Sequence, residues 1–281
     1  MIYMTYYANT GAHEEDPRFQ EARLAFCPEG APGERTILRL QGVGDRLDGR
    51  TIDRVYDTIL MHRGEPDCDL LYLMWTASAD GRYYRFYRTY TISTRTLGPV
   101  RVNRFRVGDV TRDFSTDGII SALAENGIAR KEFFSDIGIM QKLSTRVEDG
   151  ETWYYTGVYS GYWNAIIKSR DLVTWEYVAA PDFVNLSLWE NAVYVLGDRC
   201  YYFVRQDECM QGFLTCYDLV TRRWTEPCLV RDSQSRSDFV YSRGGLYLIH
   251  SPLNREGFGI LRVDTEDLAR SRPIAVVDMH D

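Results

Sequence analysis

Four acidic residues stand at matching places in the sequence, each at the entry of a short apolar run that is predicted to be a strand. They are Asp57, Asp136, Glu190 and Asp238. If these runs are equivalent strands of one repeated fold, the four carboxylates converge on a central cavity. Like charges held close in a low-dielectric cleft raise the pKa of one carboxyl group and leave another ionised. That pairing of an acid with a base is the chemistry that cleaves a glycosidic bond.

A structural interpretation of the acids stays open beside this one, because acids at strand starts also cap turns and face water. Three arginines lie near the acids in the sequence: Arg205, Arg236 and Arg255. Guanidinium groups bind a carboxylate through two parallel hydrogen bonds, so this cluster predicts recognition of an anionic sugar. In the alternative, the arginines pair with the four acids and stiffen the channel between them.

The segment 155–164 gathers aromatic side chains around two glycines. Tyr159, Tyr162 and Trp163 are predicted to form a flat wall on which a sugar ring stacks, and packing in the core is the competing interpretation. The chain as a whole holds 20 Tyr and 6 Trp, so 14% of its residues are aromatic. Packing of strands accounts for most of that excess, since aromatic residues favour strands.

The elements that would position these residues recur as a pattern of four strands. Short runs rich in Tyr, Val and Ile are separated by Gly, Asp, Asn and Pro turns. The runs group into units over 56–102, 137–178, 192–230 and 239–277. A repeat of roughly 50 residues with four antiparallel strands is typical of propeller blades. The predicted fold class is therefore all-β, a β-propeller of about five four-stranded blades.

The beginning of the chain and one internal segment depart from this pattern. Residues 2–7, 19–26 and 36–40 supply only three strands of a fifth blade, which lacks its innermost strand. Either the C-terminus supplies that strand or the chain is cut short. Residues 106–133 are predicted to be an inter-blade insertion with a short helix over 119–127, ended by Gly127. The whole chain, 1–281, is predicted to be a single propeller domain.

A local turn motif supports the repeat. In Ser169-Arg-Asp-Leu-Val-Thr-Trp175, Asp171 and Ser169 are predicted to accept hydrogen bonds from turn amides while Trp175 packs beneath the turn. Residues 78–81 and 217–224 look like partial copies of it.

Composition excludes several other classes of function. The net charge of −7 argues against a nucleic-acid partner, because phosphate contacts need a basic surface. No segment approaches the ~20 apolar residues of a membrane span. Residues 1–7 lack the features of a signal peptide, so we expect a soluble protein, either cytoplasmic or secreted with its signal removed.

The cysteines and histidines do not predict a metal site. The six Cys show no C-x-x-C spacing and the four His are scattered, so no metal and no cofactor are expected. Cys200 and Cys216 are placed to face each other across a hairpin, and we interpret them as free buried thiols.

The turn at 169–175 resembles the S-x-D-L-x-x-W turn of five-bladed glycoside hydrolases, the arabinanase-like and invertase-like group. The segment 189–205 is similar to the arabinanase-like segment that carries the general-acid Glu. It also resembles the sialidase segment in which a Glu precedes an Arg across one hairpin. The resemblance covers roughly residues 134–262, and its sialidase-like features leave a six-bladed, sialidase-like propeller as an alternative fold.

The resemblance implies roles for individual residues. Glu190 matches the catalytic or catalysis-supporting carboxylate, and Asp136 matches the Asp that orients the acid and tunes its pKa. Asp238 and Arg236 would line the far side of the pocket, and Arg205 would match a sialidase-type arginine that binds a carboxylate. The chain departs from both families, because the arabinanase-like base Asp and the sialidase Asp-boxes, early Arg motif and late Tyr have no clear counterpart.

These observations predict a glycoside hydrolase that acts on a terminal sugar at the propeller axis by a carboxylate acid/base mechanism. The partner would be an oligosaccharide or glycoconjugate. The predicted catalytic residues are Glu190, Asp136 and Asp238. The predicted substrate-binding residues are Arg205, Arg236, Arg255, Asp57, Tyr159 and Trp163. A non-catalytic carbohydrate-binding propeller is the alternative, which the missing first inner strand favours, and an assembly scaffold is a third.

Overall fold

Strands dominate the computed structural model: 63% of the described residues are in strands and 7% in helices, so the all-β, propeller-like fold predicted from the sequence is confirmed. The structure describes residues 1–11, 16–65, 67–128, 136–139, 142–160, 163–181, 188–206, 211–233, 236–252 and 257–278. It divides into two compact units. Unit 1 holds residues 1–130, 135–141 and 171–176, and unit 2 holds residues 131–134, 142–170 and 177–281. The number of blades and the single-domain organisation stay predictions.

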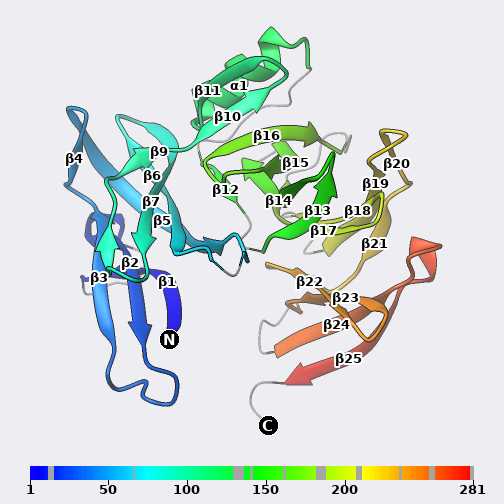
Figure 1. Ribbon diagram of the computed structural model, residues 1–281. Coiled ribbons are helices and arrows are strands. Elements are labelled where there is room, and N and C mark those ends of the chain that lie inside the picture. Colours follow the sequence, from blue (N-terminus) through cyan, green and yellow to red (C-terminus); the bar gives the residue numbers. More distant parts are fainter. Residues whose placement is uncertain are drawn as a thin grey trace. The chain divides into compact units, whose positions relative to one another are not determined.

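The first sheet of unit 1 contains the three strands expected near the N-terminus. Its antiparallel order is β1-β2-β3, drawn in blue in Figure 1. The strands are β1 (Ile2–Asn9), β2 (Gln20–Cys27) and β3 (Thr36–Gly42), with a short 3-10 turn, η1 (Pro17–Phe19), before β2. Polar turn residues separate them, as the sequence pattern indicated.

The second sheet of unit 1 carries most of its core. Its strands are β4 (Arg46–Leu47), β5 (Arg50–His62), β6 (Leu70–Ala79), β7 (Arg82–Thr91), β8 (Thr96–Leu97) and β9 (Arg101–Val102). Nearly all of β6 is buried, because both faces of this sheet are covered. Leu24 of the first sheet joins Leu73, Trp75 and Tyr90 in one apolar cluster.

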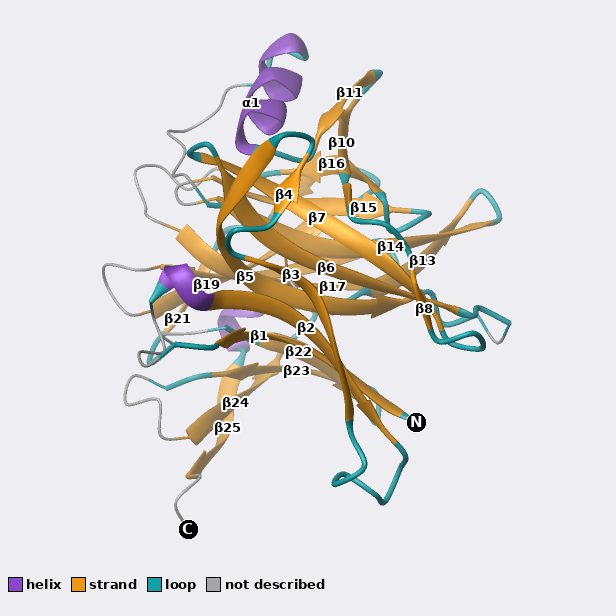
Figure 2. Ribbon diagram, turned by 90° about the vertical axis from the view of Figure 1, so that its left-hand side faces the viewer, coloured by secondary structure: helices purple, strands orange, loops and turns teal. Residues whose placement is uncertain are grey.

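The segment between this sheet and unit 2 contains the predicted helix. A hairpin of β10 (Arg104–Val107) and β11 (Val110–Asp113) leads into α1 (Thr116–Glu125), the purple helix of Figure 2. The Ser115 hydroxyl accepts a hydrogen bond from the Gly118 amide at 3.0 Å and so caps the helix. Gly127 follows α1 with φ of +66°, the left-handed conformation that ends many helices.

The chain returns to unit 1 after it has entered unit 2. β12 (Gly138–Ile139) belongs to unit 1, and the start of β16 (Thr174–Ala179) pairs in parallel with β10. In that register Phe105 lies opposite Trp175, and both side chains are fully buried. The Asn103 amide donates to the Val173 carbonyl at 3.1 Å, which ties the returning segment down.

Unit 2 consists of three successive antiparallel groups of strands. The first has β13 (Ser144–Glu148), β14 (Glu151–Ser160) and β15 (Trp163–Ser169). The second has β17 (Leu188–Leu196), β18 (Arg199–Gln206), β19 (Gln211–Asp218), β20 (Arg223–Trp224) and β21 (Cys228–Val230). The third has β22 (Asp238–Ser242), β23 (Gly245–His250), β24 (Gly257–Val263), the 3-10 turn η2 (Leu268–Arg270) and β25 (Arg272–Asp278).

The core of unit 2 lies between neighbouring groups of strands. Tyr155 and Ile166 of the first group pack with Tyr202 of the second. Phe203 of the second group packs with Phe239 of the third. Burial between the groups fixes the face that each strand turns inward, and so fixes its register.

The two central cysteines of unit 2 are free and buried, as predicted. Cys200 and Cys216 lie on the facing strands β18 and β19. Burial raises the pKa of both thiols, to about 12 for Cys216. Such thiols behave as small apolar side chains and not as nucleophiles.

The predicted turn motif recurs in the structure. The Asp171 carboxylate accepts hydrogen bonds from the Val173 and Thr174 amides at 2.8 and 2.7 Å. Asp218 does the same for the amides two and three residues after it, at 3.0 and 2.7 Å. Asp264 repeats the pattern with the Glu266 and Asp267 amides, both at 3.0 Å. The sequence motif did not predict this third copy. The partial copy at 78–81 instead forms the tight turn between β6 and β7, where Asp80 and Gly81 both have positive φ.

Among the described residues, no helix has the length and apolar character that crossing a membrane requires.

Candidate functional site

Glu190 occupies a bulge near the start of β17. The pairing of β17 with β18 shifts between Leu188 and Asn191, so Trp189 and Glu190 lie outside the regular register. A bulge turns a side chain away from its regular direction. Here it brings the Glu190 carboxylate to 2.7 Å from the Arg205 guanidinium of β18. The two side chains are 15% and 13% exposed, so the pair is sheltered but not sealed.

A buried asparagine, Asn191, anchors this bulge. Its side-chain amide donates to the Val158 carbonyl at 2.9 Å, to the Asn164 side-chain oxygen at 2.7 Å and to the Tyr202 hydroxyl at 3.1 Å. A Cβ on Gly157 would lie 1.7 Å from the Asn191 side-chain oxygen, so only glycine fits there. Asn191 therefore fixes the backbone that carries Glu190.

Tyr159, predicted to contact a sugar, connects the start of β17 with the approach to β22. Its ring centroid lies 6.2 Å from that of Trp189, the neighbour of Glu190. Its hydroxyl accepts a hydrogen bond from the exposed Arg236 guanidinium at 3.5 Å. Tyr159 and Trp163 are only 5% and 4% exposed, so packing accounts for most of their surface. Tyr162 lies outside the described residues.

Asp238 begins β22 and lies beside a lysine. Its carboxylate is 4.0 Å from the Lys142 ammonium group and accepts the Phe239 amide at 2.8 Å. Although 43% of the side chain is exposed, burial of the carboxylate among its neighbours raises the pKa of Asp238. Lys142 and the Phe239 amide oppose that shift without cancelling it. Asp238 therefore holds its proton at higher pH than an ordinary aspartate does.

Contacts place these residues at the same end of β17 and β22. The rings of Tyr194 on β17 and Tyr241 on β22 stack at 6.1 Å, so the two strands run side by side. Glu190 and Asp238 each precede their tyrosine by a few residues, toward the start of the strand. Tyr159 contacts Trp189 near the start of β17 and Arg236 just before β22, so it connects the starts of the two strands. In unit 2, contacts connect four of the predicted residues, directly or through Trp189: Glu190, Arg205, Tyr159 and Arg236. Asp238 follows Arg236 by two residues.

Asp57 lies in unit 1, in a sealed setting. It has φ of +51°, within a bulge of β5 between Tyr56 and Ile59. Its carboxylate pairs with Arg85 of β7 at 2.9 Å, and the two side chains are 1% and 0% exposed. It also accepts the Ile139 amide at 3.2 Å, while Arg85 donates to the Thr76 hydroxyl at 2.6 Å. These contacts hold three strands and the β12 segment together.

Asp136, also in unit 1, is partly buried just before β12. The carbonyl of Ile137, its neighbour, accepts the Thr76 hydroxyl, so Asp136 begins the segment that the Asp57 network holds. The four predicted acids therefore fall in two units, and their convergence on one cavity stays a prediction. Arg255 lies outside the described residues. No three His, Cys, Asp or Glu side chains of the described residues gather as metal ligands would.

Comparisons with known proteins give a fold and no family. No protein-family model matches the sequence, and no curated protein matches it. Solved structures do match. A Trypanosoma rangeli sialidase in complex with the inhibitor DANA aligns at a TM-score of 0.58 and 13% identity, over 99% of this chain and 47% of that chain. This structural similarity shows the fold alone.

Two further solved structures agree. A sialidase from Streptococcus pneumoniae aligns at a TM-score of 0.55 and 10% identity, over 99% of this chain and 59% of that one. A periplasmic gluconolactonase from Pseudomonas aeruginosa aligns at 0.51 and 11% identity, over 97% of this chain and 67% of that one. The chain spans about half the length of the Trypanosoma sialidase it matches. The propeller-like fold is therefore one that it shares with carbohydrate-active enzymes.

Proposed function

We propose that the protein is a glycoside hydrolase that acts on a terminal sugar bound at the starts of β17 and β22. The observation that supports the proposal is that contacts connect Glu190, Arg205, Tyr159 and Arg236, with Asp238 two residues after Arg236. These residues combine two carboxyl groups with two guanidinium groups and an aromatic ring, the types of side chain that hydrolysis of an anionic sugar uses.

The two carboxyl groups differ in their surroundings, which suits different roles. Burial raises the pKa of Asp238, a property that a general acid needs. Glu190 is held by Arg205 at 2.7 Å, so it would have to leave that ion pair before it could pass a proton to a leaving group. We propose Glu190 and Asp238 as the reacting pair and Asp136 as a supporting carboxylate.

Arginines would bind the sugar. A guanidinium group has five N–H donors, more than one carboxylate can accept, so Arg205 can hold Glu190 and a sugar carboxylate together. Arg236 would approach the sugar from the side of β22, with Arg255 as a third clamp. Asp57, which is sealed against Arg85, would contribute indirectly by holding the β12 segment.

A non-catalytic carbohydrate-binding propeller is the second candidate. The ion pair between Glu190 and Arg205 favours it, because a carboxylate already paired with a guanidinium group is a ready-made anchor for hydroxyl groups. In a binding propeller the same residues would hold a glycan, but no carboxyl group would be available to donate a proton.

The test is hydrolysis of fluorogenic glycosides of sialic acid, arabinofuranose, xylose, fructose and galactose. Glu190→Gln and Asp238→Asn run beside the parent protein, because each amide keeps the shape and removes proton transfer. Glu226→Gln, at an exposed position of unit 2, is the matched control. General acid–base groups contribute about 10²- to 10⁴-fold, so we expect turnover of one donor to fall by that factor in both site variants.

Other outcomes decide between the candidates. Turnover that survives both amide substitutions would place the activity elsewhere and contradict the proposed site. Absence of turnover on every donor, with glycan binding that is lost in Arg205→Gln, would establish the binding propeller.

A further inference from the structure

A second feature of unit 2 is a groove lined by arginines at the third group of strands. It has a volume of about 400 Å³ and is bounded by the β22–β23 turn, the end of β24, η2 and the start of β25. The lining residues are Gly244, Gly245, Leu246, Arg262, Val263, Asp264, Thr265, Arg270 and Arg272. None of them belongs to the candidate site, so the groove is independent of the proposed function.

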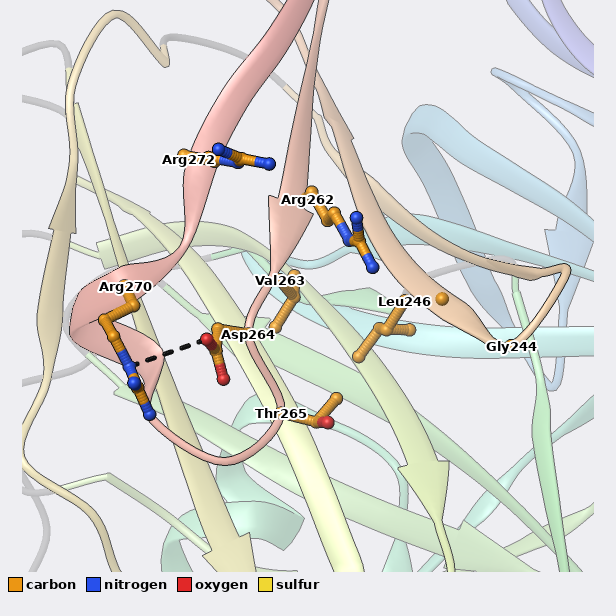
Figure 3. Close-up of a pocket in the computed structure, with 9 residues that line it drawn as sticks. Gly244, Leu246, Arg262, Val263, Asp264, Thr265, Arg270 and Arg272 are labelled. Atoms are coloured by element: carbon orange, nitrogen blue, oxygen red, sulfur yellow. Dashed lines mark ion pairs between the residues drawn. The ribbon is translucent and has the colours of Figure 1, made fainter.

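Two of the arginines lie directly opposite each other. Arg262 of β24 pairs in register with Arg272 of β25, and both side chains are exposed. Directly opposed residues of an antiparallel pair point to the same face, with Cβ atoms about 4.5–5.5 Å apart. In the view of Figure 3 the Arg272 side chain extends toward the strand that carries Arg262, and the Arg262 side chain continues in the same direction, toward the side of Leu246 and Gly244. Tyr247 of β23 stands next in the same row.

This arrangement costs stability unless something neutralises it, because like charges directly opposite on a sheet repel. Within the described residues neither Arg262 nor Arg272 forms an ion pair or a side-chain hydrogen bond. The acid among the lining residues is already engaged: Asp264 pairs with Arg270 at 3.6 Å, as Figure 3 shows, and accepts the Glu266 and Asp267 amides. Arg270 is held a second time by Asp267 at 3.2 Å.

The charge of the residues that line the groove indicates the charge of the ligand that would fit it. Arg262 and Arg272 contribute two positive charges that no ion pair of the described residues neutralises, whereas Arg270 is held by both Asp264 and Asp267. The amides of Asp267 and Glu266, followed by the charges of Arg270 and Arg262, lower the pKa of Asp264, so its charge persists at neutral pH. A dianion would neutralise the lining, whereas a single carboxylate would leave half of the charge.

We propose that this groove binds the dianionic phosphate group of a phosphate monoester between Arg262 and Arg272. Guanidinium groups match the oxygens of phosphate in a bidentate manner, and two of them can hold it from both sides. Small-molecule sites usually occupy about 300–1,000 Å³. A cavity of about 400 Å³ therefore holds more than the phosphate group and leaves room for one sugar-sized substituent.

The turn between β22 and β23 gives access to the groove. Arg243 and Gly244 both have positive φ, and a Cβ on Gly244 would meet no atom within 4 Å. The backbone there is therefore open, and a ligand can approach it closely.

The test is titration of the full chain with inorganic phosphate and glucose 6-phosphate by calorimetry, at constant ionic strength and near pH 7.5. Glucose, glucose 6-sulfate and glucuronate are the uncharged and singly charged probes. Arg262→Gln/Arg272→Gln is the site variant, and Arg223→Gln/Arg231→Gln, two exposed arginines of the same unit, is the control with equal charge. We expect saturable binding of the phosphates that weakens about a hundredfold in the site variant and about twofold or less in the control.

Lowering the pH to about 5 should weaken binding further, because the second pKa of a phosphate monoester is about 6. Tighter binding of glucose 6-phosphate than of phosphate would identify a phosphorylated sugar as the ligand, and equal binding would identify the phosphate group alone. Glucuronate or the sulfate ester binding as tightly as phosphate would overturn the proposal. Equal losses in the site variant and the control, or no saturable binding of either phosphate, would also overturn it.

Discussion

The two units each hold an acid–arginine pair at a strand bulge, and the two pairs differ in their access to water. In unit 1, Asp57 and Arg85 are 2.9 Å apart and 1% and 0% exposed. In unit 2, Glu190 and Arg205 are 2.7 Å apart and 15% and 13% exposed. The first acid lies in a bulge of β5 and the second in a bulge of β17. The same pair of residue types therefore occupies similar backbone settings in both units.

The surroundings of the two pairs suit them to different roles. Asp57 also accepts a backbone amide, and Arg85 also donates to Thr76, so these groups are committed to the protein itself. A buried pair is costly to break, since removing one partner leaves an uncompensated charge. The pair of unit 2 keeps some contact with solvent, so a ligand can replace one partner at lower cost. Exposure, and not residue type, decides which pair is available for chemistry.

The largest expected effect that tests this comparison is on stability. Arg85→Gln should lower the free energy of unfolding by about 3–5 kcal/mol, because it strands the buried Asp57 carboxylate. The matched Arg205→Gln should cost less, because Glu190 is 15% exposed and keeps some contact with water. Urea unfolding of both variants measures the difference. Equal losses of unfolding free energy in the two variants would mean that both ion pairs contribute equally to stability.

A smaller effect should follow from crowding the anchor of the second pair. Gly157→Ala places a methyl group 1.7 Å from the Asn191 side-chain oxygen, so Asn191 must move and the bulge with it. Overpacking of this kind costs about 1–3 kcal/mol in unfolding free energy. Gly33→Ala, where a Cβ meets no atom within 4 Å, is the control. If glycan turnover or binding by Gly157→Ala stayed at the parent level, Asn191 would not position Glu190.

The smallest effect concerns pH. Burial raises the pKa of Asp238 above its unfolded value of about 3.8, so the protonated form is favoured in the folded state. Its contribution to stability is complete below that unfolded value and is lost as pH rises through the raised pKa. Because the side chain is 43% exposed, solvent screens the effect. Relative to Asp238→Asn, the parent should lose unfolding free energy as pH rises above about 4. Parallel curves of unfolding free energy against pH would contradict the raised pKa.

The sequence predicts most of the strands because their signals are local. Turn residues and alternating apolar runs lie next to each other in the chain, and the helix signal ended by Gly127 is equally local. The Asp171 turn and its copy at Asp218 were found for the same reason. The pairing of Arg205 with Glu190 was one of two stated alternatives, since both residues lie on one hairpin.

Other parts of the site depend on contacts that no local pattern contains. The burial of Asp57 depends on Arg85 and on a segment some 80 residues away, and no local sequence pattern connects these parts of the chain. Asn191 does carry a local signal, because a polar residue inside an apolar strand needs a buried partner. The opposed Arg262 and Arg272 depend on a register that shifts between Ile260 and Leu261, and such a shift is invisible to a pattern of period two.

Residues 171–176 belong to unit 1, and this has a consequence for folding during synthesis. Phe105 is synthesised about 70 residues before Trp175, its partner on the neighbouring strand. Domains begin to fold while the ribosome is still adding residues. One edge of β10 therefore stays unpaired until residues 174–176 have emerged from the ribosome. An unpaired strand edge can pair with another chain in that interval.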